Sequence, residues 1–435
     1  MPATLTANAL RQYLRPGTRV YWPGCAGQSP LFEQWLRAEP ELASGVHFSG
    51  MWIPGVNRFD PTGLHAEARA TTFFLPPEFH AGLQRGAVDH LPLHYSEAVQ
   101  WLGTPGRFDL LMLHLPPPDA RGRCSLSLAA DFTPAVLAGL AAGARVLAHI
   151  NPQLPITRGP WVDAARIDAW VHAGVPPLAL HDGPLDSATD ATTDTAIDAV
   201  ARQVAGCIHD GDTLQFGLGR LQAAVLHALV GHRRLRIHSG MVSSGLLGLA
   251  AAGALAACEA GDDGPLPPVC TGVALGSSAL YSRMADAELV RFAPVQHTHA
   301  QTTLAGIPNF VSINSALEID LLGQVNCETL HGRQVSGVGG LVDFLRGARA
   351  SSGGRAIMAG TATAGRAGVS RIVPQLAPGP VGLARGDVDV VITEHGVAQL
   401  RHLGVEARAK ALISVAAPTH RAGLEAAWHT LKRTL

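Results

Sequence analysis

Short runs of Val, Ile and Leu alternate with helical patterns along the whole chain, and this alternation leaves few architectures open. Three of the runs, at 18–24, 108–119 and 144–155, each read as a strand that leads into a loop. A strand followed by a helix and a further strand is the unit from which parallel sheets are built. Hydrophobic residues make up 47% of the chain and charged residues only 15%, which suits sheets buried on both faces. The sequence therefore predicts an α/β protein with mostly parallel sheets.

A polar stretch rich in Asp and Thr interrupts the pattern at 181–196, and we interpret it as a linker. After it the pattern starts again, with a helix expected at 195–207, then a turn and a strand. The turn and strand at 209–219 resemble the turn and strand at 15–24 in the first part. This similarity favours two copies of one α/β fold over the alternative of two unrelated α/β domains. The predicted domains are 1–185 and 186–435.

The charges of the chain exclude several classes of protein. Its 33 Lys and Arg nearly balance 34 Asp and Glu, and a net charge of −1 does not suit a nucleic-acid binder or a polybasic membrane binder. The only lysines are Lys410 and Lys432, both near the C-terminus. A P-loop needs a lysine after a glycine-rich turn, and imine chemistry needs a lysine inside a pocket. We therefore expect neither in this chain.

The cysteines and the apolar segments give no sign of secretion or membrane insertion. The six cysteines include no C-x-x-C pair, so we expect reduced thiols rather than a zinc ribbon or a disulfide framework. The N-terminus has no apolar core of the signal-peptide kind, and the longest apolar run, at about 245–258, is too short to span a bilayer. We therefore expect a cytoplasmic protein without a membrane partner.

Two glycine-rich loops precede expected helices. In the first, Gly217 and Gly219 follow a strand and open a helix, a geometry that directs free backbone N–H groups at an anion or a developing oxyanion. It is not a dinucleotide fingerprint, because Gln222 stands where the third glycine belongs. A tight turn without a ligand is the alternative for this loop. The glycines of the second loop are Gly337, Gly339 and Gly340. Together the two loops suit a substrate with phosphates and a reactive carbonyl.

Two of the 20 histidines, His297 and His299, lie two positions apart. On a strand their rings would share one face, as metal ligands can, but no third ligand is near them in the sequence, and we predict no metal site. A general base, or a hydrogen-bonded polar pair at a strand end, is the favoured interpretation.

Seven motifs follow one another in a fixed order along the chain. They are PPPDARGRCSLS (116–127), INPQLPITRG (150–159), GDTLQFGLG (211–219), INSALEIDLLGQVN (313–326), SGVGGLVDFLRGA (336–348), SRIVPQL (370–376) and ARGDVDVVITEHGVAQLR (384–401). This series resembles the acetyl-CoA hydrolase/transferase family, which includes acetate, succinate and 4-hydroxybutyrate CoA-transferases. The resemblance implies two tandem CoA-transferase-type α/β domains and a homo-oligomer such as a homodimer. It also implies an acyl derivative of coenzyme A as substrate, with a small acid or water as the second reactant.

In the family that this chain resembles, the nucleophile is a glutamate at the end of a strand, in a motif similar to Ile-His-Thr-Glu-Met. The glutamate attacks the acyl-CoA to form a mixed anhydride, and CoA returns to give a glutamyl thioester. The matching stretch here reads Ile-His-Ser-Gly-Met, so Gly240 stands at the glutamate position. A family asparagine is likewise replaced by His299. The resemblance places the contacts to CoA and to the oxyanion at the two glycine-rich loops and at Asp343.

The first hypothesis is therefore a hydrolytic enzyme that acts on acyl-CoA. Water would occupy the space left by the glutamate, activated by His299 or, as second choice, by His238. Backbone N–H groups near Gly219, Gly339 and Gly340 would stabilise the oxyanion. Hydrolytic carbon–carbon cleavage of a β-keto acyl-CoA and direct acyl transfer to a bound acceptor are variants of this hypothesis.

Two alternatives remain open at the level of the sequence. One keeps CoA transfer between an acyl-CoA and a carboxylate, with Glu318 or Glu394 as the nucleophile. The other is a protein that binds CoA without catalysis, such as a regulator or a partner subunit.

Overall fold

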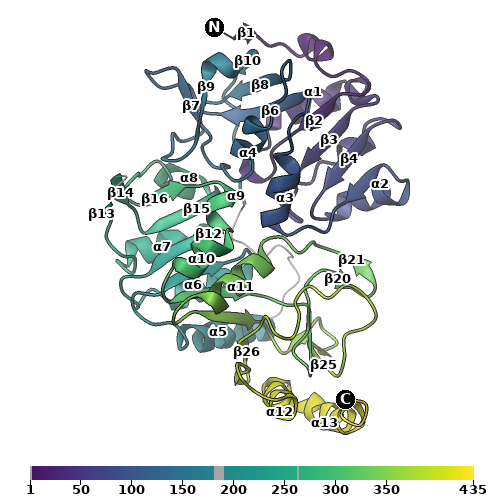
Figure 1. The fold of residues 1–435 in the computed structure, drawn as a ribbon, viewed down its shortest axis with the longest axis vertical. Coiled ribbons are helices and arrows are strands. Elements are labelled where there is room, and N and C mark those ends of the chain that lie inside the picture. The colour runs from purple at the N-terminus through teal and green to yellow at the C-terminus, as the bar shows by residue number, and fades with distance from the viewer. Residues whose placement is uncertain (1, 181–190, 262–263) are drawn as a thin grey trace.

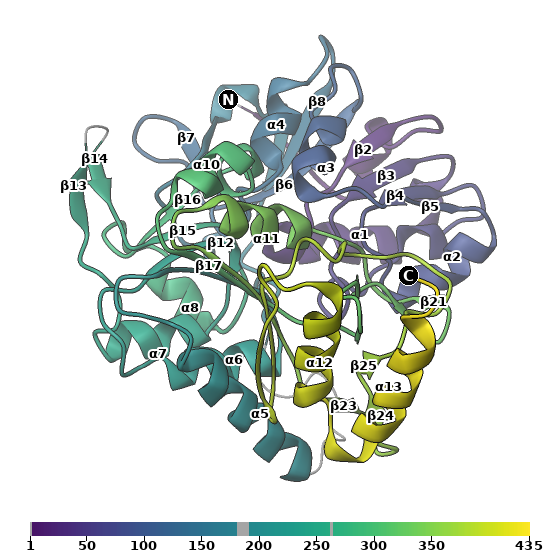
Figure 2. The same cartoon turned by 60° about the horizontal axis from the view of Figure 1, so that its bottom comes forward.

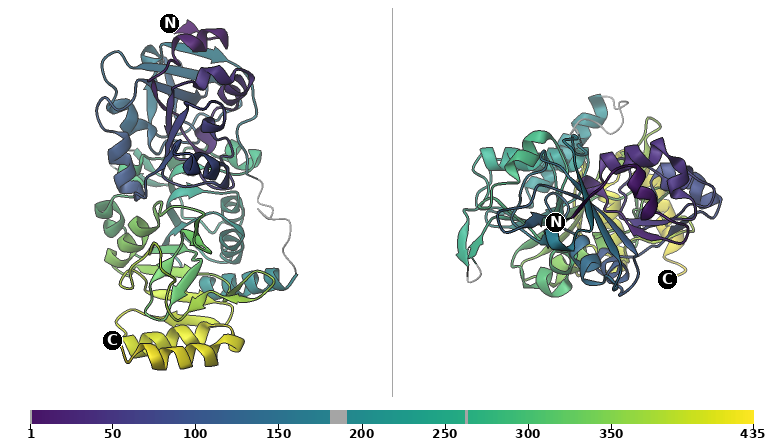
Figure 3. Two further views of the ribbon diagram at one scale, coloured as in Figure 1. Left: turned by 90° about the vertical axis from the view of Figure 1, so that its right-hand side faces the viewer. Right: turned by 90° about the horizontal axis from the view of Figure 1, so that it is seen from above.

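The computed structural model describes residues 2–180, 191–261 and 264–435. Two eight-stranded sheets form its frame, one built from strands between residues 3 and 172 and the other from strands between residues 213 and 399. Figure 1 shows the N-terminal sheet, in purple and blue, above the second sheet in teal and green. The molecule is elongated in this direction, with the N-terminus at one end and the C-terminal helices at the other (Figure 3). The predicted α/β fold is confirmed.

The strands of the first sheet are all parallel to their neighbours. In spatial order they are β1 (Ala3–Thr4), β10 (Ala169–His172), β8 (Arg145–Ile150), β6 (Leu110–Leu115), β2 (Arg19–Tyr21), β3 (His47–Gly50), β4 (Arg69–Thr72) and β5 (Val88–His90). Strand β6 is buried along its whole length, as expected for a parallel strand with both faces covered. The three strands predicted from the apolar runs correspond to β2, β6 and β8.

Four α-helices and one small antiparallel pair of strands complete this half. Helix α1 begins where the Ser29 side chain accepts a hydrogen bond from the Phe32 N–H and proline occupies the first turn, both typical of a helix start. Helices α3 and α4 pack against each other. The elements are α1 (Pro30–Ala38), α2 (His80–Gln84), α3 (Tyr95–Leu102), α4 (Thr133–Ala138), β7 (Arg123–Ser125) and β9 (Trp161–Asp163).

The second sheet is parallel except at one edge, where its last two strands form an antiparallel pair. In spatial order its strands are β16 (Val290–Phe292), β15 (Val269–Ala274), β12 (Arg236–Val242), β11 (Thr213–Phe216), β17 (Phe310–Asn314), β22 (Arg355–Ala359), β26 (Val390–Thr393) and β27 (Gly396–Gln399). Strand β11 lies between β12 and β17. The carboxyl ends of these three strands therefore lie side by side.

Helices cover both faces of the second sheet, with α5, α6 and α7 on one side and α10 and α11 on the other (Figure 2). The helices are α5 (Ala191–Ala205), α6 (Arg220–Ala228), α7 (Gly245–Ala251), α8 (Ser278–Arg283), α9 (Val295–Thr298), α10 (Gln301–Gly306), α11 (Leu341–Ala350), α12 (Val405–Val415) and α13 (Pro418–Leu431). The small strands are β13 (Glu259–Gly261), β14 (Gly264–Leu266), β18 (Glu318–Asp320), β19 (Val325–Asn326), β20 (Thr329–Leu330), β21 (Arg333–Gln334), β23 (Thr363–Ala364), β24 (Val369–Ser370) and β25 (Ile372–Val373).

The linker prediction is wrong for residues 191–196, because they form the start of helix α5. Residues 181–190 of that prediction lie outside the described residues. None of the helices described is both long and apolar enough to cross a membrane.

The two sheets are joined by a shared hydrophobic core. Its largest cluster of buried side chains takes Phe132 from the first half and Val295 from the second. Backbone hydrogen bonds cross the same boundary, from the Ala130 N–H to the Gly272 carbonyl at 2.9 Å and from the Ala274 N–H to the Leu128 carbonyl at 2.9 Å. Because this boundary excludes water and carries paired backbone groups, residues from both halves can shape one site.

Candidate active site

A cavity of about 310 Å³ lies at the boundary between the two halves, at the carboxyl ends of β11, β12 and β17. Open parallel sheets commonly bind their ligands at this edge. Both halves line the cavity. The lining residues are Ile53, Phe74 and Tyr95 from the first half, and Gln215, Phe216, Gly217, Leu218, Gln222, Ser239, Gly240, Met241, Val273, His299, Asn314, Ser315, Cys327, Ser336, Gly337, Val338, Gly339, Gly340, Leu341 and Phe344 from the second.

Six of the predicted site residues line this cavity together, although they come from four separate segments. The short turn after β11 contributes one glycine, and the loop before α11 contributes three. Strand β12 and the end of α9 contribute the remaining two. These six are Gly217, Gly240, His299, Gly337, Gly339 and Gly340.

The imidazole of His299 occupies the space that a side chain at position 240 would need. A Cβ atom built on Gly240 would lie 2.7 Å from Cε1 and 2.9 Å from Nε2 of His299. The same ring also closes off Gly340, whose Cβ would lie 2.5 Å from Nε2. Carbon and nitrogen atoms that are not bonded to each other do not approach this closely, so glycine at both positions makes room for the ring.

Aromatic rings from both halves hold His299. Its ring centroid lies 4.9 Å from that of Tyr95 and 4.4 Å from that of Phe344, and only 1% of the residue is exposed. Burial, and then the neighbouring His238, lowers the pKa of His299 to about 3. The imidazole is therefore neutral at physiological pH, because a buried cation without a partner is costly.

A hydrogen-bond chain favours one tautomer of His299. Its Nδ1 lies 2.8 Å from Oγ1 of Thr298, and that hydroxyl lies 3.4 Å from the Pro294 carbonyl oxygen. If the hydroxyl donates to the carbonyl, it accepts from Nδ1–H. Nε2 then keeps its lone pair, directed at Gly240 and Gly340.

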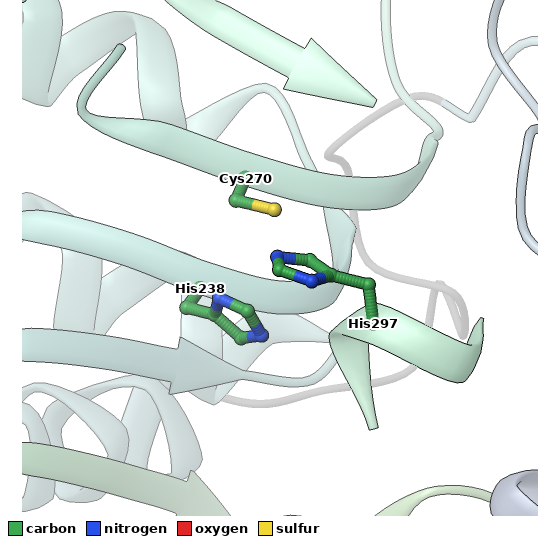
Figure 4. A group of neighbouring side chains, drawn as sticks. All are labelled: His238, Cys270 and His297. Atoms are coloured by element: carbon green, nitrogen blue, oxygen red, sulfur yellow. The ribbon is translucent and has the colours of Figure 1, made fainter. Parts of the chain in front are cut away.

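The predicted strand conformation of His297 and His299 is wrong. His297 lies in helix α9, and His299 is the residue that ends it. Their rings consequently point to different places. His297 joins His238 of β12 and Cys270 of β15, and possible ligand atoms of these three lie within 4.8 Å of one another (Figure 4).

This His-His-Cys cluster contains His297 but not His299, and an arginine already hydrogen-bonds two of its three members. The guanidinium of Arg291 lies 2.7 Å from Nε2 of His297 and also hydrogen-bonds the Cys270 thiol. The Nε2 of His238 lies 3.1 Å from the Thr298 carbonyl oxygen. The cluster therefore reads as a hydrogen-bonded group behind the site, and His238 does not line the cavity.

The glycine-rich loop before α11 packs against the first half of the chain. A Cβ on Gly337 would overlap the Phe73 carbonyl oxygen, and Gly339 has a positive φ of 55° with its Cβ position 2.7 Å from Cζ of Phe74. The Gly339 carbonyl also accepts a hydrogen bond from the Tyr95 N–H at 3.1 Å. Here the glycines permit close contact between protein segments as well as with a ligand.

The turn after β11 has a different geometry. Gly219 adopts a φ of 118°, which side chains rarely allow, and it is the N-terminal cap of helix α6. It does not line the cavity, whereas Gly217, Leu218 and Gln222 do.

The predicted carboxylates lie outside the cavity. Asp343 accepts hydrogen bonds from the Ser96 hydroxyl at 2.6 Å and from the Ser96 N–H at 3.1 Å, so it fastens α11 to the start of α3. Burial raises the pKa of this carboxyl group, and the Ser96 hydrogen bonds oppose the shift. Glu318 accepts from Asn326, and Glu394 accepts from the Ala362 N–H. None of the described residues that line the cavity is an aspartate or a glutamate.

Sequence reasoning missed the amide side chains of the site. Oε1 of Gln215 lies 2.8 Å from Nδ2 of Asn314 and 2.6 Å from the Ser312 hydroxyl. Nε2 of Gln222 donates to the Ser315 hydroxyl at 3.0 Å. Two of these residues, Asn314 and Ser315, belong to the motif at 313–326, and their position at the carboxyl end of strand β17 is the signal that could have identified them.

Comparison with known proteins shows close relatives over the whole chain. A family model described as the acetyl-CoA hydrolase/transferase C-terminal domain matches residues 276–428. A 4-hydroxybutyrate coenzyme A transferase of Clostridium kluyveri is 33% identical over 427 residues, covering 97% of this chain and 96% of the relative.

Solved structures agree with this result. The crystal structure of RipA from Yersinia pestis matches with a TM-score of 0.86 and 25% identity, covering 99% of this chain and 97% of that one. A 4-hydroxybutyrate CoA-transferase from Porphyromonas gingivalis matches with a TM-score of 0.77 and 28% identity, covering 100% of this chain and 98% of that one. The chain described here therefore belongs to the acetyl-CoA hydrolase/transferase family and is an enzyme whose substrate is a coenzyme A thioester.

Proposed function

We propose that this enzyme hydrolyses an acyl-CoA thioester, with His299 as general base and without an enzyme-bound thioester. One observation carries the proposal: the His299 ring fills the place where a side chain at position 240 would stand. Transfer through a glutamyl thioester needs a carboxylate in contact with the thioester, and no described cavity-lining residue supplies one. An imidazole in that place acts on water instead.

The reaction balances with this single side chain. Nε2 of His299 takes a proton from water while the water oxygen bonds to the thioester carbon. The carbon–sulfur bond then breaks, and the CoA thiolate takes the proton back from Nε2. The products are the free acid and CoA. The low pKa of His299 keeps Nε2 unprotonated before the reaction, and the negative charge of the tetrahedral intermediate beside it favours the protonated ring once attack occurs.

Backbone N–H groups of residues that line the cavity are available to stabilise the oxyanion. The N–H groups of Gly339 and Gly340 donate no hydrogen bond in the described part of the chain, and both residues line the cavity. Two such donors aimed at a carbonyl oxygen form an oxyanion hole. The thiol of Cys327, which also lines the cavity, is a poor nucleophile because burial raises its pKa to about 12.

The test is a paired substitution that rebuilds the side chains expected from the family resemblance. Gly240→Glu alone sets the new Cβ against the His299 ring, whereas Gly240→Glu with His299→Asn removes that ring and provides a carboxylate. We expect the natural protein to release CoA from a thioester without any acceptor. We expect the double variant to exchange CoA with added carboxylates and to be labelled at position 240 by borohydride. Thiol release and peptide mass mapping measure both.

Two results contradict the proposal. Exchange that depends on an added carboxylate in the natural protein, with a label on Glu318 or Glu394, points to CoA transfer instead. Tight CoA binding without turnover of any thioester points to a protein that binds CoA but does not catalyse. His299→Asn alone is the control, since it lacks both the base and the carboxylate.

A further inference from the structure

Resting on the proposed hydrolysis, we infer a substrate class for the cavity: the acyl group that reaches His299 is uncharged and largely apolar, and acyl groups that end in a carboxylate are rejected. The inference comes from the side chains that line the cavity, the partners that hold its polar groups, and the contacts that engage two arginines close to the site.

No charged side chain of the described residues lines the cavity. Among the described residues that line the cavity there is no Lys, Arg, Asp or Glu. Burial keeps its titratable side chains neutral, because it lowers the pKa of His299 and raises the pKa of Tyr95 and Cys327. A carboxylate moved from water into such a site loses its hydration and gains no counter-charge. Sites that accept a second carboxylate normally provide an arginine fork or a lysine for it.

Two arginines close to segments of the site are already engaged in contacts of their own. Arg220, two residues before Gln222, forms an ion pair with Asp194 of helix α5. Arg291 is held by His297 in the cluster behind the site, at 2.7 Å. Neither one lines the cavity, and turning either toward it would break the existing contact.

The polar lining groups mostly satisfy one another. Gln215 and Asn314 are paired at 2.8 Å, and Gln222 is paired with Ser315 at 3.0 Å. Neutral amides and hydroxyls provide dipoles for the thioester carbonyl, but they do not replace a cation opposite a carboxylate.

The remaining walls are apolar and come from both halves of the chain. The first half contributes Ile53 and Phe74, and the second contributes Met241, Val273 and Phe344. An aliphatic chain gains free energy by leaving water for these walls, and the gain grows with each buried methylene group. Selection between acyl groups of equal length therefore depends on their charge.

The test compares four-carbon thioesters that differ in their last group. We expect kcat/KM of the full-length enzyme for succinyl-CoA to be at least about 100-fold below that for butyryl-CoA, the factor typical of an unpaired buried charge. Equal values for the two thioesters, or a preference for succinyl-CoA, would overturn the inference.

A matched pair of variants tests the cause. Gln222→Lys places a cation in the cavity at similar length, and Gln222→Met removes the same hydrogen bonds without adding charge. We expect Gln222→Lys to raise the succinyl-to-butyryl ratio of kcat/KM about 10-fold or more, and Gln222→Met to leave that ratio low. A ratio that rises equally in both variants, or in neither, contradicts the charge argument.

A failure of the proposed hydrolysis is distinguished from a failure of the inferred substrate class. If neither thioester is hydrolysed, the hydrolytic proposal fails, and binding then decides the substrate class. The probes are ketone analogues in which a methylene group separates the CoA sulfur from the carbonyl, one with a butyryl-like end and one with a succinyl-like end. Tighter calorimetric binding of the uncharged analogue supports the inference, and equal or weaker binding overturns it.

Discussion

Two residues of the candidate site share one volume. Gly240 offers no side chain, and the ring of His299 takes the space beside it. The ring is buried among aromatic side chains and bound at Nδ1 by Thr298, which leaves Nε2 to face the cavity. Under the function proposed above, the glycine removes the nucleophile expected from the family resemblance, and the His299 ring beside it supplies a different route of attack on the thioester.

At the scale of single residues, we predict that His299→Gln lowers kcat for thioester hydrolysis by about 10²- to 10⁴-fold, the range typical of a lost general base. Because the pKa of His299 is about 3, kcat/KM of the natural enzyme should show no acid limb near pH 6.5 from this group. Stopped-flow or steady-state thiol release between pH 4.5 and 8 measures both. The exposed His429 of helix α13 provides the control, His429→Gln. An acid limb near pH 6.5 that disappears in His299→Gln would show that the ring is not held neutral.

At the scale of elements, the loop before α11 connects the two halves of the chain at the cavity. Its glycines pack against Phe73 and Phe74. Helix α11, which follows the loop, is held to α3 by the hydrogen bond from the Ser96 hydroxyl to Asp343. The site is thus formed by the docking of one half on the other. A substitution in this loop should affect both the fold and the activity.

We predict that Gly337→Ala lowers the free energy of unfolding by about 1–3 kcal/mol, because its Cβ would overlap the Phe73 carbonyl oxygen in a tightly packed boundary. Gly248→Ala is the matched control. Gly248 is exposed inside helix α7 with no atom near its Cβ position, and alanine there should raise stability by about 0.5–1 kcal/mol. Urea denaturation followed by circular dichroism measures both. Equal stability of Gly337→Ala and the natural protein would contradict the packing argument.

At the scale of the whole molecule, both halves bury histidines as neutral rings. Burial lowers the pKa of His114 to about 3 in the first half, and of His238 to about 4 and His299 to about 3 in the second. Each ring would take a proton near pH 6.5 in the unfolded chain. Between pH 6.5 and about 4 the unfolded state therefore binds more protons, and the folded state loses stability as the pH falls.

We predict that each such histidine lowers the free energy of unfolding by about 1.4 kcal/mol for every pH unit by which the pH falls within this range. His299→Gln should therefore show a shallower fall in unfolding free energy between pH 6 and pH 4.5 than the natural protein. His429→Gln, which removes an exposed ring, should leave the slope unchanged. Urea unfolding at several pH values provides the measurement. Parallel slopes for His299→Gln and the natural protein would mean that the ring takes up a proton in the folded state as well.

The predicted α/β fold rests on a pattern that is local in the chain. The apolar run of β6 is buried from end to end between its two neighbouring strands. Of the glycines singled out in the two loops, Gly217, Gly337, Gly339 and Gly340 line the cavity, and Gly219 does not. The conformation of His297 and His299 was mistaken because a short polar stretch carries no clear period, and the packing of α9 decided it.

The sequence by itself determined the α/β architecture, the family, and the absence of a side chain at position 240. The architecture follows from the hydrophobic periodicity, and the other two follow from motifs. Only the tertiary structure decided what stands in that place. His299 reaches Gly240, and Glu318 and Glu394 do not reach the cavity, since the folding of the second half brings together residues far apart in the chain. The physical reason is close packing: one ring excludes every other group from the volume it fills.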